Sequence, residues 1–111
     1  MKSSVLGCGR WGTYIAHYLN TLGHDVLLWG RSGSERLGSL VRTKKNEYLS
    51  LDETIELSSS LFDAVQYSDR IFISIDSQQL RNLAQKLHSY DISHKIIILC
   101  MKGLENNTGM R

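Results

Sequence analysis

Proline is absent from this chain of 111 residues, and no internal repeat or low-complexity segment occurs. Segments of that kind commonly mark the linkers between domains. We therefore expect residues 1–111 to form a single domain.

Cysteine is scarce, and long apolar runs are missing. Cys8 and Cys100 form neither a CxxC pair nor a spacing with histidine that suits a metal, so no structural metal is expected. The longest apolar run, residues 96–101, is far shorter than the about 20 residues of a membrane span. We find no signal peptide and expect a cytoplasmic protein with reduced cysteines.

The chain also lacks a large excess of charge of either sign, because the formal net charge is only +2. The basic cluster at Arg42, Lys44 and Lys45 is too small to favour a nucleic-acid surface. The sequence therefore favours neither a nucleic acid nor a membrane as partner.

Apolar residues recur in alternating segments with the period of a strand or of a helix. Strands are expected at residues 3–6, 26–29, 71–75 and 95–100, with a brief edge strand at 55–57. Helices are expected from about residue 10 to Gly23, from a cap at Ser34 to about Val41, after a cap at Ser60, and after Asp76. Residues 43–54 show no clear period and are expected to be an irregular crossover.

The sides of these elements that face the core can also be predicted. The strand at 26–29 has no polar alternation, which predicts burial on both faces. Two helical stripes are expected to be buried, while Thr13 falls outside them. The stripes comprise Ile15, Ala16, Leu19 and Leu22 on the first helix, and Leu80, Leu83, Ala84 and Leu87 on the last.

This alternation is typical of an α/β fold with a doubly wound parallel sheet, the Rossmann type. The chain stops a few residues after its last expected strand, without the helix that normally covers that side. We therefore expect a domain truncated on its C-terminal side and belonging to a longer protein.

The segment Gly7-Cys8-Gly9-Arg10-Trp11-Gly12 has the pattern G-x-G-x-x-G. The pattern alone is weak evidence, but here it follows an expected strand and opens an expected helix within a βαβ unit. In that setting Gly7 permits a tight turn, Gly9 lets the backbone approach a pyrophosphate, and Gly12 lets the helix lie close to the sheet. We expect backbone amides and the helix dipole to bind a dinucleotide there, although the glycines could serve only as turn residues.

The residues after the second expected strand bear on the choice of cofactor. NAD-selective folds place an Asp or Glu there for the ribose hydroxyls, whereas this chain has Gly30, Arg31 and Ser32. A cation and a hydroxyl suit an adenosine 2′-phosphate, which favours NADP. NAD stays open, because Arg31 could also be solvated or stacked on adenine.

The two cysteines are expected to lie on strands separated by an intervening strand. Two strand spacings of roughly 4.8 Å are too far for a disulfide. Cys8 is interpreted as a small residue in a tight turn, with a reactive thiol near the helix dipole as the alternative.

Several segments share motifs with one known family. They are Val5-Leu6-Gly7-Cys8-Gly9-Arg10-Trp11-Gly12-Thr13, Gly23-His24-Asp25-Val26, Leu28-Trp29-Gly30-Arg31, Asn46-Glu47-Tyr48-Leu49, Ser77-Gln78-Gln79-Leu80-Arg81 and Met101-Lys102-Gly103-Leu104-Glu105. Over essentially its whole length the chain resembles the N-terminal domain of bacterial-type NAD(P)-dependent glycerol-3-phosphate dehydrogenase.

The resemblance implies roles for particular residues. In the family, the residues at Arg10, Trp11 and Arg31 touch the dinucleotide, and Lys102 stands where nicotinamide and substrate meet. A lysine after the fifth strand would also suit a phosphate or hydroxyl oxygen. Two departures are that Arg10 replaces the family's usual serine, and Asp76 stands where proline is common.

The resemblance implies hydride transfer between NAD(P)H and dihydroxyacetone phosphate, giving sn-glycerol 3-phosphate for phospholipid synthesis. In the family, the proton-donating lysine and the phosphate clamp lie in a helical C-terminal domain that this chain lacks, so no catalytic residue is assigned here. We expect these 111 residues alone to bind the dinucleotide weakly and to turn over nothing, and a homo-oligomer stays open. The alternatives are another NADP-linked reductase and a stand-alone dinucleotide-sensing module.

Overall fold

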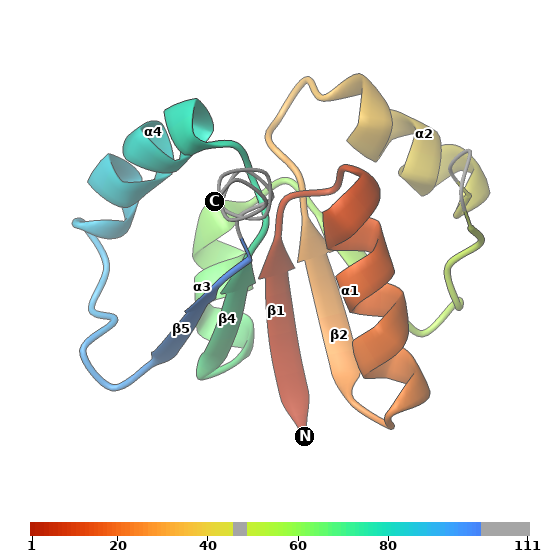
Figure 1. The fold of residues 1–111 in the computed structure, drawn as a ribbon, viewed down its shortest axis with the longest axis horizontal. Coiled ribbons are helices and arrows are strands. Elements are labelled where there is room, and N and C mark those ends of the chain that lie inside the picture. Colours follow the sequence, from red (N-terminus) through yellow and green to blue (C-terminus); the bar gives the residue numbers. More distant parts are fainter. Residues whose placement is uncertain (46–48, 101–111) are drawn as a thin grey trace, which may run out of the picture.

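The computed structural model describes residues 1–45 and 49–100, in which strands and helices alternate along the chain (Figure 1). The elements are β1 (Lys2–Leu6), α1 (Arg10–Thr21), β2 (Asp25–Trp29), α2 (Glu35–Thr43), β3 (Glu56–Ser58), α3 (Leu61–Tyr67), β4 (Arg70–Ile73), α4 (Ser77–Leu87) and β5 (Ile96–Leu99).

The strands form one parallel sheet in the order β3-β2-β1-β4-β5. The chain winds outward from β1 to β3, then crosses back through α3 to place β4 on the other side of β1 (Figure 1). The predicted doubly wound parallel sheet is therefore confirmed, and its winding reverses between β1 and β4. β3 lies at an edge of the sheet, as expected.

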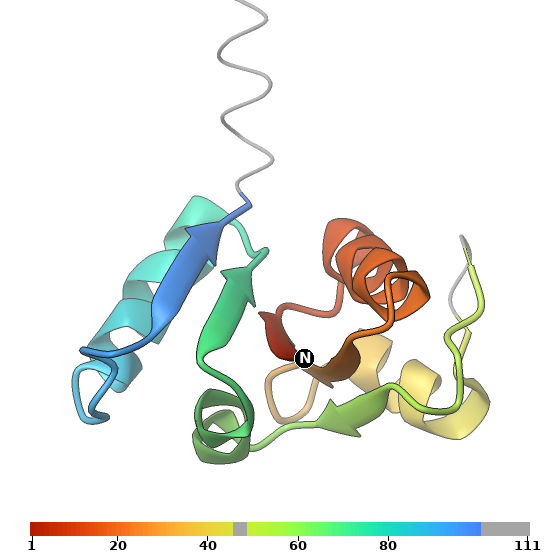
Figure 2. The same cartoon turned by 90° about the horizontal axis from the view of Figure 1, so that it is seen from below.

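Helices cover both faces of the sheet. α1 and α2 pack with Val5, Val26 and Leu28 on one face. α3 and α4 pack with Leu27 and Trp29 on the other, and Figure 2 shows α1 and α3 on opposite sides of β1. The prediction that residues 26–29 are buried on both faces is confirmed.

Capping residues set the helix starts that the sequence predicted. The side chains of Ser34, Ser60 and Asp76 accept hydrogen bonds from the backbone N–H groups of the residues three positions later, at 3.3, 3.2 and 2.8 Å. Gly23 follows α1 with a φ of 92°. Each prediction of a cap is confirmed.

Several element boundaries differ from the prediction by one or two residues. β1 and β2 begin one residue earlier than expected, β3 covers Glu56–Ser58 rather than 55–57, and β5 covers Ile96–Leu99 rather than 95–100. β4 ends at Ile73 rather than at residue 75, because the chain turns toward the cap of α4 after Ser74 donates one last hydrogen bond to the Leu6 carbonyl (2.8 Å). α2 continues to Thr43, two residues beyond the expected end.

The buried faces of two helices also differ from the prediction. Leu22 is 58% exposed because it follows the last residue of α1, and Ala84 is exposed because α4 buries only the ridge through Leu83 and Leu87. Thr13 is buried, because its hydroxyl donates to the carbonyls of the preceding turn.

β5 lies at the other edge of the sheet and is poorly covered. In the described part of the chain it pairs only with β4. Ile96 and Leu99 are 56% and 53% exposed, and Ile97 is 36% exposed. The strand is therefore apolar but open to solvent on both faces.

Candidate functional site

A large open cavity of about 1150 Å³ lies at the carboxyl ends of the strands, where the winding reverses between β1 and β4. Its walls come from the loop after β1, the first turn of α1, the loop after β2, the first turn of α2, and the loop and helix after β4. Ligands of open α/β sheets bind at this place. The cavity is at least as large as typical small-molecule pockets, which hold about 300 to 1,000 Å³.

The loops around the cavity are joined by main-chain hydrogen bonds that continue the sheet by one residue beyond β1, β2, β4 and β5. The N–H groups of Gly7, Gly30, Ser74 and Cys100 donate to carbonyls of the neighbouring strands at 2.8, 3.0, 2.8 and 2.8 Å. The floor of the cavity is thus fixed by peptide groups.

Gly7 and Gly12 pack too tightly for any side chain. A Cβ on Gly7, whose φ is +118°, would lie 2.1 Å from the Ser74 carbonyl oxygen. A Cβ on Gly12 would lie 1.7 Å from the Gly7 carbonyl oxygen. These contacts hold the loop against β4 and the first turn of α1 against the loop.

Gly9 differs from the other two, because its open side faces the cavity. It is the N-cap of α1, with no side-chain cap and no acidic residue in the first turn. Among the residues that the structure describes, a Cβ built on it would meet only the Arg36 guanidinium, with Nη1 at 2.7 Å. Backbone without a side chain at the positive end of a helix dipole is a cradle for an anion such as a pyrophosphate.

Cationic side chains gather around this cradle. Arg10, Arg31, Arg36 and Lys86 line the cavity, against the carboxylates of Glu35 and Asp76. The three arginines are exposed, and the Arg10 guanidinium lies 5.9 Å from the Trp11 ring centroid. The electrostatic balance of the lining therefore favours an anionic ligand.

The residues predicted for the site are placed as follows. Gly7, Gly9, Arg10, Trp11 and Arg31 line the cavity.

The other three predicted residues stand differently. Gly12 supports the loop from behind. Ser32 is exposed in the loop after β2 and does not line the cavity. Its two neighbours in the chain, Arg31 and Gly33, do line it. Lys102 lies outside the described residues.

Sequence reasoning did not find Arg36, because the Ser34 cap locates the first turn of α2 but does not show that this turn packs beside Gly9. The only signal was a basic residue in the first turn of the helix that follows the second strand. It also did not identify Trp29 as a lining residue. The indole N–H of Trp29 is buried without a hydrogen-bond partner in the described chain.

The two cysteines are separate thiols at this edge of the sheet, as expected from their strands. Cys8 is buried, with its sulfur 3.8 Å from the Ser34 hydroxyl. Burial raises the pKa of the Cys100 thiol, which keeps it protonated at neutral pH. The described thiols therefore pack around the cavity, and Cys100 is not poised as a nucleophile.

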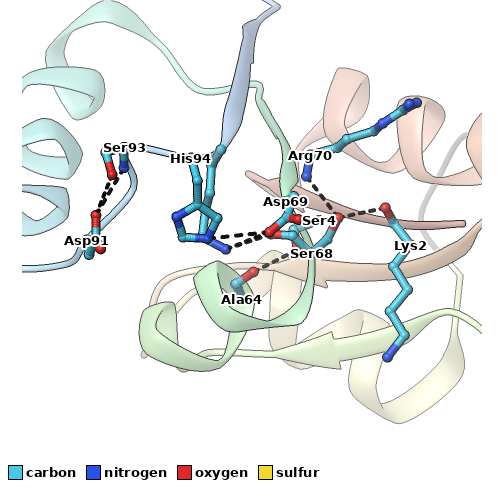
Figure 3. Close-up of polar contacts among 10 residues, drawn as sticks. Lys2, Ser4, Ala64, Ser68, Asp69, Arg70, Asp91, Ser93 and His94 are labelled. Carbon is cyan, nitrogen blue, oxygen red and sulfur yellow. Dashed lines mark hydrogen bonds and ion pairs between the residues drawn. The ribbon is translucent and has the colours of Figure 1, made fainter.

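The opposite, amino edge of the sheet carries a polar network (Figure 3). The Ser68 hydroxyl donates to the Lys2 carbonyl at 2.6 Å and accepts from the Arg70 N–H at 2.9 Å. Asp69 lies 3.6 Å from His94 and 3.4 Å from Lys95, whose side chain is only 4% exposed. These bonds tie β1, β4 and β5 together at the edge away from the cavity.

Other kinds of site find no support in the described chain. Residues 1–45 and 49–100 contain no cluster of three His, Cys, Asp or Glu side chains that could hold a metal. None of the helices found there is long and apolar enough to cross a membrane.

Comparison with known protein families decides the relationship. Residues 2–111 match the family model described as the N-terminus of NAD-dependent glycerol-3-phosphate dehydrogenase. The chain belongs to this family. The expected resemblance is thus confirmed over nearly the whole length.

Individual relatives support the same family assignment. The chain is 37% identical over 111 residues to a glycerol-3-phosphate dehydrogenase (NAD(P)+) of Thermoanaerobacter sp., covering 97% of this chain and 33% of the relative. It is 33% identical over 113 residues to the enzyme of that name from Staphylococcus aureus, covering 99% and 34%. The chain therefore spans about a third of the length of these relatives.

Solved structures of the family show the same fold. A glycerol-3-phosphate dehydrogenase from Coxiella burnetii superposes with a TM-score of 0.82 at 21% identity, over 91% of this chain and 32% of that one. The enzyme from Saccharomyces cerevisiae gives 0.71 at 27% identity, over 91% and 33%.

Proposed function

We propose that this chain is the dinucleotide-binding domain of a glycerol-3-phosphate dehydrogenase, and that it binds NADP in preference to NAD. The observation that carries the proposal is the Gly9 cradle, which opens onto a cavity at the point where the sheet winding reverses. Membership of the family supports a nicotinamide dinucleotide as the ligand.

Each predicted residue then has a role in the bound state. Gly7 and Gly12 shape the loop, Gly9 admits the pyrophosphate, and amides of the first turn of α1 bind it. Arg10 and Trp11 border the same ligand, and Lys102 contacts nicotinamide and substrate.

The preference for NADP rests on the end of β2. Arg31 lines the cavity there with an exposed guanidinium, and no acidic residue replaces it as a partner for ribose hydroxyls. Ser32 adds a hydroxyl in the same loop. A planar guanidinium suits the 2′-phosphate of NADP.

The reaction itself needs more than this domain. The dinucleotide, when bound, supplies a hydride for the carbonyl of dihydroxyacetone phosphate. We propose that residues 1–111 act as one dinucleotide-binding domain, that the groups which donate the proton and bind the substrate phosphate lie in another domain, and that the protein is cytoplasmic.

The test is a titration of the 111-residue chain with NADPH and NADH, alongside an Arg31→Ala variant. Loss of the guanidinium should weaken NADPH binding by about 1 to 3 kcal/mol and leave NADH nearly unchanged. Arg81→Ala is the matched control, because Arg81 is exposed on α4 and does not line the cavity. Equal binding of NADPH and NADH by the unchanged chain would contradict the preference, and binding of neither would contradict the function.

A further inference from the structure

Arg36 reaches from α2 to the phosphate cradle. It is the second residue of that helix, it lines the cavity, and its Nη1 lies 2.7 Å from the position that a Cβ on Gly9 would occupy. Apart from the Arg36 guanidinium, no heavy atom of residues 1–45 and 49–100 beyond the immediate chain neighbours comes within 4 Å of that position. One guanidinium therefore borders the glycine that caps α1 and faces the cavity.

The first turn of α2 is held in a position that places Arg36 beside Gly9. The Ser34 hydroxyl caps the helix by accepting from the Leu37 N–H, and the Cys8 sulfur lies 3.8 Å from the same hydroxyl. Cys8 in turn fills the space beside Gly30, where a Cβ would come within 2.6 Å of its sulfur. The glycine loop, the end of β2 and the start of α2 thus pack as one unit.

In the described part of the chain, no carboxylate pairs with the Arg36 guanidinium. Within residues 1–45 and 49–100 it makes no hydrogen bond or ion pair, and the carboxylate of Glu35 beside it forms no ion pair there either. The side chain is exposed and lines the cavity, so a ligand can reach it without breaking a hydrogen bond or ion pair between the described residues.

We propose that Arg36 binds the pyrophosphate of the dinucleotide from the α2 side, facing the amides of the first turn of α1. The inference rests on the proposed function, because it assigns a further contact to the same ligand. A guanidinium fork can bind two phosphate oxygens at once and carries a full positive charge, which the backbone N–H groups of a helix N-terminus do not.

The position of Arg36 favours the pyrophosphate over the 2′-phosphate. The second glycine of the pattern is the point where the backbone approaches the pyrophosphate, and Arg36 lies against that glycine. Arg31, at the end of β2, lies where the adenosine ribose would be. The two arginines are therefore expected to act on different parts of the ligand.

This division of roles can be tested with Arg36→Ala, Arg36→Lys and Arg42→Ala in the 111-residue chain. Arg42 is the control, because it is an exposed arginine in the last turn of the same helix and does not line the cavity. Arg36→Ala should weaken NADH and NADPH by the same factor, about 10-fold to 100-fold, whereas Arg42→Ala should change neither. Arg36→Lys should recover part of the loss, because it keeps the charge but not the fork.

The remaining outcomes each have one meaning. A loss confined to NADPH would assign Arg36 to the 2′-phosphate, and tighter binding by Arg36→Ala would show that the side chain blocks the site; both overturn the inference. So would unchanged binding, or an equal loss with Arg42→Ala, while the proposed function would stand. Failure of the unchanged chain to bind either dinucleotide would overturn the proposed function together with the inference.

Discussion

At the scale of single residues, Gly7, Gly9 and Gly12 differ in what a methyl group at each would meet. At Gly12 the methyl group would lie 1.7 Å from the Gly7 carbonyl oxygen, which is a backbone atom and cannot rotate away as a side chain could. At Gly9 it would meet, among the described residues, only the tip of the flexible Arg36 side chain, and the φ of −78° there suits any L-residue. Gly12 therefore serves the fold, and we propose that Gly9 serves the ligand.

This difference predicts opposite phenotypes for two alanine substitutions. Gly12→Ala should lower the free energy of unfolding by about 3 kcal/mol or more, because α1 must move away from the loop. Gly9→Ala should change the unfolding free energy by less than about 1 kcal/mol but reduce dinucleotide affinity strongly, because the methyl group fills the cradle. Urea unfolding and ligand titration of both variants measure the two effects. A Gly9→Ala chain that binds NADPH as well as the unchanged chain does would contradict the assigned role.

Single residues were predictable from the sequence where a local backbone constraint was involved. The glycine pattern indicates a turn and a close approach because both depend on residues within the same six positions. Arg36 could not be predicted, since its place beside Gly9 arises from the packing of segments 27 residues apart. The burial of Thr13 was missed for a related reason: its hydroxyl binds carbonyls of its own helix, so polarity did not indicate exposure.

At the scale of elements, Asp76 shows one side chain with two opposing effects. Its Oδ1 caps α4 by accepting from the Gln79 N–H at 2.8 Å, and its charge lies on the wall of a cavity suited to anions. The cap stabilises the helix, and the charge opposes a phosphate ligand.

Two substitutions at this position should separate the effects. Asp76→Asn keeps a capping oxygen and removes the charge, so stability should hold and dinucleotide affinity should rise by about 0.5 to 1 kcal/mol. Asp76→Ala should gain the same affinity but lose about 1 kcal/mol of unfolding free energy with the cap. Thermal unfolding and titration in low salt provide the readouts. Weaker binding by Asp76→Asn would show that the carboxylate helps to bind the ligand.

Elements were predictable where caps and apolar periods agreed. The starts of α2, α3 and α4 follow from Ser34, Ser60 and Asp76, because a capping oxygen acts within three residues. The ends were less predictable. β4 stops at Ile73 although Ile75 is apolar, because Ile75 turns toward the cavity and the glycine loop instead of continuing the ladder.

At the scale of the whole molecule, the apolar edge at β5 contrasts with the buried centre of the sheet. Leu99 is 53% exposed, whereas Val5, Val26 and Ile71 in the central strands are fully buried. An exposed apolar edge strand presents both an apolar surface and unpaired backbone groups, and each can associate with another chain.

The 111-residue chain should therefore self-associate with rising concentration, and Leu99→Lys should reduce this. A charge on an edge strand opposes pairing between sheets. Val41→Lys is the control, because Val41 is 61% exposed on α2, away from β5. Sedimentation velocity at several concentrations measures the association. A concentration-independent monomer, or an equal effect of both lysines, would contradict the assignment to β5.

The hydrogen bonds that extend β1, β2, β4 and β5 by one residue at the cavity come from the backbone alone. They are made by the N–H groups of Gly7, Gly30, Ser74 and Cys100, which belong to the peptide unit and not to any side chain. Every amino acid except proline carries that group, and proline does not occur in this chain. These four hydrogen bonds therefore do not depend on side-chain chemistry, so a substitution elsewhere in the lining leaves the floor of the site its bonding groups.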